Sequence, residues 1–220
     1  MISVITPTVR PKGLALVSQA LERQTFKDFE HIVQGREGKL GDNYWTIYQD
    51  YNIAVRKAKG ELIVSWQDFT YAKSDALQKF WDHYQEDNKV IVTGVGNKYE
   101  NDEWIVQTWQ DPRQRTDQGT YYGCFYNDIE WNFCAVPKKA ILEVGGFDER
   151  LDKYSSLCGL DVLDRLNIKG GWDFKIDQTN ESFSLEHGRL PGWEENSPFK
   201  GAYDKIRKEY LENPVLDYLK

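Results

Sequence analysis

The chain has little cysteine, no long apolar run and no excess of positive charge. Its three cysteines, Cys124, Cys134 and Cys158, have neither an even count nor the spacing of a metal site, so we expect reduced thiols in a cytoplasmic protein. A membrane-spanning helix needs about 18 or more apolar residues in a row, and no such run occurs. A net charge of −7 argues against an extended nucleic-acid surface, because such surfaces are usually basic.

The first residues also lack the features of a signal peptide. Met1-Ile2-Ser3-Val4-Ile5-Thr6-Pro7 has no basic region and no long apolar stretch, and it predicts a first β-strand instead. Aromatic residues, in contrast, are plentiful, since 8 Trp, 13 Tyr and 10 Phe make up 14% of the chain. Such rings build hydrophobic cores, and flat rings also pack on the C–H faces of sugars. Composition alone favours a role for these aromatic residues in the hydrophobic core.

Strand-like and helix-like runs alternate through the first hundred residues. Short β-branched runs predict four strands, at residues 2–5, 31–33, 62–64 and 90–92. Apolar residues three to four positions apart predict helices between them, at residues 14–21, 48–58 and 77–84. This order predicts an α/β fold with a mainly parallel central sheet flanked by helices. Ligands of such sheets bind beyond the carboxyl ends of the strands, here at residues 6–10, 34–36 and 67–70.

Four ordered motifs carry a resemblance to a known family. They are Ile2-Ser3-Val4-Ile5-Thr6-Pro7-Thr8, Gln24-Thr25-Phe26-Lys27-Asp28-Phe29-Glu30, Asn52-Ile53-Ala54 with Ala58-Lys59-Gly60-Glu61, and Val144-Gly145-Gly146-Phe147-Asp148-Glu149. In order and spacing they resemble family-2 glycosyltransferases of the GT-A fold. The resemblance implies a nucleotide-sugar donor, assistance by Mn²⁺ or Mg²⁺, and transfer of a hexosyl or pentosyl group with inversion at the anomeric carbon.

The resemblance also implies how the chain is organised. One GT-A domain is expected over residues 1–220, with a nucleotide-binding half at about 1–98. An acceptor-side half with a smaller mixed sheet follows at about 99–190, and a helical tail at 195–220. The acceptor is expected to be a carbohydrate hydroxyl, because the chain is acidic and aromatic and lacks a membrane helix for lipid acceptors. The sequence does not determine the oligomeric state.

The cation is expected at the end of the third predicted strand. In the family this strand ends in an Asp-x-Asp motif, whereas the matching stretch here is Gln67-Asp68-Phe69, with one carboxylate. Asp68 is the first expected metal ligand, because one carboxylate together with phosphates and waters can hold Mg²⁺; a capping aspartate is the alternative. His187, after the last predicted strand, would be a further ligand favouring Mn²⁺, or else an exposed loop histidine.

The donor is expected to contact the loops beyond the strands and two further polar positions. Gln34 stands where relatives usually carry an acid that recognises the base, and an amide can also bond a base edge. Asn52 matches a family position near the ribose and diphosphate, or else it faces water. Arg189 can bind phosphate through its fork, or it is a surface charge. The expected donor residues are Thr6, Pro7, Thr8, Arg10, Gln34, Asn52, Gln67, Asp68 and Arg189.

A general base must accept the proton of the acceptor hydroxyl. Aligned without gaps, the Glu-Asp pair of the family falls on Cys158-Gly159, and neither residue can act as this base. A small shift makes Asp161 the base, although an i, i+4 ion pair with Arg165 explains Asp161 equally well. Asp128 and Glu130 are the reserve candidates.

Trp131 and Asn132 follow the reserve candidates directly, at a position that lines the acceptor side in relatives. Trp131 would stack on a sugar ring and Asn132 would donate hydrogen bonds, with a core position for Trp131 as the alternative.

Two other functions compete with glycosyl transfer. A nucleotidyltransferase would normally carry a glycine-rich loop after the first strand, which Thr6-Pro7-Thr8-Val9-Arg10 lacks. A silent relative that binds nucleotide or sugar without turnover is favoured by the missing second aspartate and by Cys158-Gly159.

Overall fold

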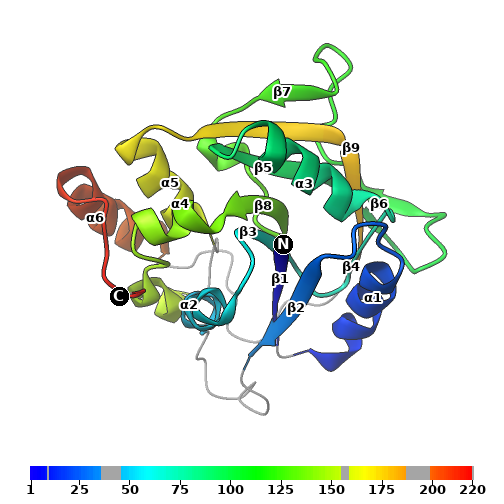
Figure 1. Cartoon of the computed structure of the whole chain (residues 1–220), viewed down its shortest axis with the longest axis horizontal. Helices are drawn as coiled ribbons and strands as arrows, with labels where there is room; N and C mark the ends of the chain where they lie inside the picture. The colour runs from blue at the N-terminus through cyan, green and yellow to red at the C-terminus, as the bar shows by residue number, and fades with distance from the viewer. Residues whose placement is uncertain (9, 36–45, 155–158, 187–198, 220) are drawn as a thin grey trace.

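Nine strands form one hydrogen-bonded sheet in the computed structural model, which describes residues 1–8, 10–35, 46–154, 159–186 and 199–219 (Figure 1). The strands are β1 (Ile2–Pro7), β2 (Phe29–Gln34), β3 (Leu62–Trp66), β4 (Thr70–Ala72), β5 (Val90–Tyr99), β6 (Gln107–Trp109), β7 (Tyr121–Gly123), β8 (Phe133–Pro137) and β9 (Asp173–Leu185). The main path of the sheet runs β2-β1-β3-β8-β5-β9-β4, while β6 pairs with β5 and β7 with β9.

The α/β fold class predicted from the alternating runs is confirmed. Strand β1 pairs in parallel with both β2 and β3. All residues of β1, β3 and β8 are buried, as expected for apolar runs covered on both faces. Strand β8 was not predicted, and it lies antiparallel between β3 and β5. Strands β2, β1, β3, β5 and β9 therefore run in one direction, and β8 and β4 run in the other.

Helices cover both faces of this sheet. They are α1 (Pro11–Glu22), α2 (Ile47–Lys57), α3 (Ala76–Glu86), α4 (Lys138–Glu143), α5 (Leu160–Lys169) and α6 (Phe199–Glu212), with 3₁₀ turns η1 (Tyr126–Asp128) and η2 (Glu149–Tyr154). Helices α1 and α3 contribute to one apolar cluster, together with Val4 and Val64 from the sheet. The other helices contribute to a second cluster with Ile5 and Ile63, because successive strand residues face opposite sides. Within the described ranges no helix is long and apolar enough to cross a membrane.

Two local predictions were wrong. The alternating residues 103–109 predicted a continuous strand, but only β6 forms, because Trp104 has a φ of 57° that a bulky side chain rarely adopts in an extended run. Ser74 stands just before an apolar helical pattern, which predicts a helix cap, but it does not cap α3, which begins after Asp75 without a side-chain cap. Instead, the Ser74 carbonyl accepts a hydrogen bond from the Thr25 N–H at 2.7 Å.

Candidate functional site

The predicted ligand loops and the predicted acceptor segment meet at one edge of the sheet. The Thr8 N–H donates to the Gln34 carbonyl at 2.8 Å, joining the ends of β1 and β2. The Gln67 N–H donates to the Asn132 carbonyl at 2.9 Å. This second contact arises because β8 runs antiparallel to β3, so the residues before β8 lie beside the residues after β3.

Asp68 and Arg10 form a two-point ion pair at this edge. The Arg10 Nε donates to Asp68 Oδ2 at 2.9 Å, and Nη2 donates to Oδ1 at 2.5 Å. The Thr8 hydroxyl also donates to Oδ2, at 2.5 Å, and accepts the Arg10 backbone N–H at 2.8 Å. The Asp68 side chain is 1% exposed and that of Arg10 19%, so the guanidinium is the more accessible partner.

The residues described at this edge do not fit the expected Mn²⁺ or Mg²⁺ centre. Both oxygens of Asp68 accept hydrogen bonds from Arg10 or Thr8, so a cation bound to Asp68 would compete with this ion pair. Across the part of the chain that the structure describes, no three His, Cys, Asp or Glu side chains gather to hold a metal. His187 and Arg189 lie outside the described residues.

Thr6 and Pro7 are part of the sheet rather than of an open loop. Both are buried in β1. The Thr6 hydroxyl donates to the Trp66 carbonyl at 2.8 Å and lies 3.0 Å from His31 Nε2. Strand β1 continues as a paired strand up to Pro7, and the predicted contact of Thr6 and Pro7 with the donor stays a prediction.

The Asn52 side chain also makes its hydrogen bonds within the protein. Its side chain is buried, its amide nitrogen donates to the Phe147 carbonyl and to Glu149 Oε1, both at 2.9 Å, and its oxygen accepts the Phe147 N–H at 2.8 Å. These bonds tie α2 to the Gly-Gly-Phe motif. The water-facing alternative does not match this buried position, and the predicted contact with the donor stays a prediction.

Gln34 keeps a position suited to a ligand at the end of β2. Its side-chain oxygen accepts the Lys57 ammonium at 2.8 Å, and its nitrogen lies 3.4 Å from Asp50 Oδ1. It is only partly buried. Its recognition of a nucleotide base stays a prediction.

Asp161 lies in a buried ion pair. Its Oδ2 accepts Arg165 Nη2 at 2.7 Å and the Asp148 N–H at 2.9 Å, and both Asp161 and Arg165 side chains are 0% exposed. Burial raises the pKa of Asp161, and the charge of Arg165 opposes that rise. Arg165 also donates to the carbonyls of Val144 and Gly146. The geometry is that of the i, i+4 alternative, with the carboxylate fully buried.

Trp131 belongs to the core, the second of the two predicted alternatives. It is 4% exposed and packs edge-on against Tyr51 and Phe147, with ring centroids 5.8 and 5.2 Å away. A Cβ atom on Gly159 would lie 2.1 Å from the indole, so the start of α5 closes over it. The predicted stacking of Trp131 on a sugar was wrong. Asn132, in contrast, is exposed.

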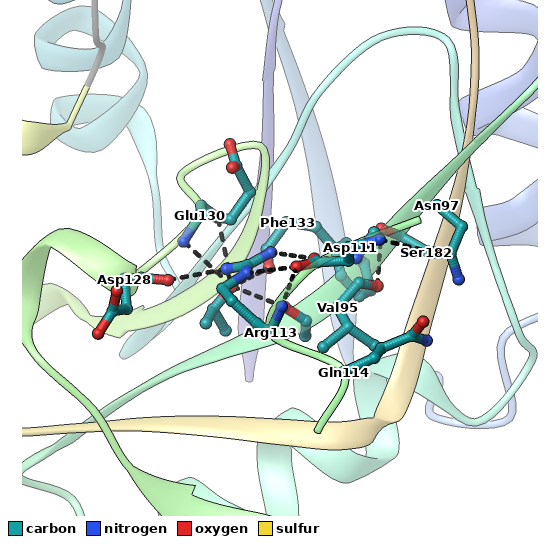
Figure 2. A network of polar contacts seen from close by, with 12 residues as sticks. Val95, Asn97, Asp111, Arg113, Gln114, Asp128, Glu130, Phe133 and Ser182 are labelled. Carbon is teal, nitrogen blue, oxygen red and sulfur yellow. Dashed lines mark hydrogen bonds and ion pairs between the residues drawn. The ribbon is translucent and has the colours of Figure 1, made fainter. Parts of the chain in front are cut away.

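A network not predicted from the sequence supports the segment before β8. The Asp111 carboxylate accepts Arg113 Nε at 2.9 Å, Arg113 Nη2 at 2.5 Å and the Gly96 N–H at 2.8 Å. Arg113 Nη1 donates to the Asp128 carbonyl at 2.8 Å. Figure 2 shows this network beneath Glu130, whose carboxylate points away from Arg113. The polar loop at 111–119 did not predict this network, because Gly96 and the Asp128 carbonyl lie 15 positions away from their partners in the loop.

Glu130 combines exposure with a perturbed pKa. The residue is exposed, yet the surrounding protein reduces its hydration and raises the pKa of its carboxyl, while Arg113 and the Asn132 N–H act in the opposite direction. Asp128 differs, because its Oδ2 accepts the Phe125 N–H at 3.0 Å and so closes the turn η1. An accessible carboxylate whose pKa is shifted by its surroundings is a candidate for proton transfer.

Comparison with known proteins gives a fold but no sequence family. No protein-family model and no curated protein matches the chain. Among solved structures, S. aureus TarS 1–349 in complex with UDP-GlcNAc has a TM-score of 0.71 at 14% identity, over 99% of this chain and 70% of that one. GalNAc-T7 with UDP, GalNAc and Mn²⁺ has a TM-score of 0.64 at 12% identity, over 96% of this chain and 48% of that one.

These likenesses, together with the strand order, define the fold. The chain has the GT-A fold of nucleotide-sugar transferases. It spans 36% of the TarS chain in another TarS structure, which matches with a TM-score of 0.64.

Proposed function

We propose that the chain is an inverting glycosyltransferase that moves a sugar from a nucleoside-diphosphate donor to a hydroxyl of a carbohydrate acceptor. The observation that supports this best is the placement of Glu130. An exposed carboxylate of raised pKa precedes the strand that lies beside β3, and the carboxyl end of β3 is where sheets of this kind bind ligands.

In the proposed reaction the donor lies along the ends of β1, β2 and β3. Glu130 accepts the proton of the acceptor hydroxyl, and the hydroxyl oxygen bonds to the anomeric carbon. The bond from that carbon to the diphosphate breaks, and its electron pair leaves with the nucleoside diphosphate. A single displacement inverts the anomeric carbon. Asn132, exposed beside Glu130, is proposed to orient the acceptor.

Two of the sequence-based candidates are not needed for this reaction. Asp161 is proposed to hold the start of α5 through Arg165 rather than to act as the base. No step is assigned to Mn²⁺ or Mg²⁺, because Asp68 is paired with Arg10 and Thr8. A cytoplasmic location is proposed on the free thiols of Cys124 and Cys134.

The test is release of nucleoside diphosphate from a panel of sugar nucleotides in the presence of mono- and oligosaccharide acceptors. A general base contributes about 10²- to 10⁴-fold, so Glu130→Gln should lower kcat by at least about 100-fold. Glu103→Gln, which changes an exposed glutamate in the loop at 100–106 between β5 and β6, is the matched control and should leave kcat unchanged.

Other outcomes separate the competing functions. Loss of turnover in Asp128→Asn with full activity in Glu130→Gln would move the base to Asp128. Tight binding of a sugar nucleotide without release for any acceptor would identify a silent relative and refute the proposed enzyme.

A further inference from the structure

The ion pair at the end of β3 bears on how a diphosphate would be neutralised. Given the function proposed above, we propose that Arg10, held by Asp68, is the cationic group that binds the donor diphosphate, so that nucleotide binding needs no divalent cation. The residues that carry this proposal are Arg10, Asp68, Thr8 and Phe69.

The first argument is the state of Asp68. Its carboxylate is 1% exposed and accepts three hydrogen bonds, two from Arg10 and one from Thr8. A cation could bind Asp68 only by displacing Arg10, which would separate a nearly buried ion pair. Separating such a pair is strongly unfavourable, because each charge has given up its hydration.

The second argument is the orientation of the guanidinium. Arginine has five N–H donors in a rigid plane. Arg10 directs the edge made by Nε and Nη2 at Asp68, and Nη1 donates to no group within the described residues. The edge formed by Nη1 and the second Nη2 hydrogen therefore remains for a ligand. This edge matches two phosphate oxygens in a bidentate contact.

The third argument is that the guanidinium is preorganised. The Arg10 Cζ lies 5.1 Å from the centroid of the Phe69 ring, and the Arg10 N–H is fixed by the Thr8 hydroxyl. Phe69 itself has a φ of 58°, an uncommon backbone for an aromatic residue that turns its ring toward Arg10. Little conformational entropy is left to lose when a phosphate binds.

The arrangement of the two charges in the Arg10–Asp68 pair favours the binding of an anion. Asp68 lies inside and Arg10 is the partly exposed partner, at 1% and 19% exposure. A ligand that approaches the carboxyl ends of β1 and β3 therefore meets the positive end of the pair first. The carboxylate orients the guanidinium from behind, and the guanidinium presents its positive charge to the ligand.

The test is binding of UDP and GDP by isothermal titration calorimetry, on protein treated with EDTA and again with added Mn²⁺. In wild type, Kd without metal should lie within about threefold of Kd with Mn²⁺. Arg10→Gln should weaken metal-free binding about 10- to 100-fold, as expected for loss of charge-assisted hydrogen bonds, and Arg10→Lys should recover part of it. Lys12→Gln, which removes an exposed charge two residues away, should change Kd by less than about threefold.

The double variant Arg10→Gln/Asp68→Asn distinguishes the loss of nucleotide binding from a folding defect. It replaces both charges with amides and should fold, as judged by circular dichroism, but still bind UDP weakly. Binding that occurs only with Mn²⁺ and disappears in Asp68→Asn would overturn the proposal and make Asp68 a metal ligand. Metal-free binding that Arg10→Gln leaves intact would also overturn it. If no nucleotide binds under any condition, the proposed function itself fails.

Discussion

Replacing Asp161 by asparagine removes the negative charge that balances Arg165 inside the protein. Both side chains are fully buried and their atoms lie 2.7 Å apart. Removing one partner of such a pair costs about 3–5 kcal/mol, because the other charge stays buried without compensation. At about 2–4 °C per kcal/mol for a domain of this size, we expect Asp161→Asn to lower Tm by roughly 6–20 °C.

The measurement is thermal unfolding followed by circular dichroism, together with nucleoside diphosphate release at a temperature well below the new Tm. Activity per folded molecule should stay within a few-fold of wild type, since the carboxylate is structural. Asp117→Asn, which breaks the exposed pair with Arg115, is the control and should leave Tm unchanged. An unchanged Tm with abolished release in Asp161→Asn would refute the reasoning and identify Asp161 as the base.

Three further predictions follow from single contacts. In Arg113→Gln the pKa of Glu130 should rise, because a nearby positive charge is lost. The acidic limb of the pH dependence of kcat/KM should therefore move to higher pH. An unchanged acidic limb would exclude Glu130 as the base. Asn52→Ala breaks three hydrogen bonds, two of them buried, and should lower the free energy of unfolding in urea by about 2–4 kcal/mol, with Kd for UDP unchanged. Weaker UDP binding at unchanged stability would instead support its predicted donor role. Gly145→Ala should destabilise the protein more than Gly170→Ala. Both glycines have a positive φ, but only a Cβ at Gly145 would meet a backbone carbonyl oxygen, 1.7 Å away. Equal decreases in the free energy of unfolding in urea would show that backbone strain alone matters.

The regular elements and the location of the site follow from local patterns. Apolar runs buried on both faces identify β1 and β3, and the parallel order of strands places their carboxyl ends at one edge. The prediction that Thr8, Gln67 and Asp68 gather there required no knowledge of side-chain contacts.

The chemistry at that edge was decided by contacts between distant parts of the chain. Asn52 and Phe147 are 95 positions apart, and Arg10 and Asp68 are 58 apart. A polar residue that matches a family position is equally compatible with ligand binding and with a buried hydrogen bond. Only the packing shows whether its donors and acceptors are already used.

The sequence by itself determined an α/β sheet and a ligand edge at the ends of its first three predicted strands, because strand periodicity and chain order are local properties. The tertiary structure decided that β8 enters beside β3 and places Glu130 at that edge. It also decided that Asp161 is paired inside the protein and that Asp68 is held by Arg10. Burial and partner choice depend on the whole fold, and they determine which carboxylates remain available for chemistry.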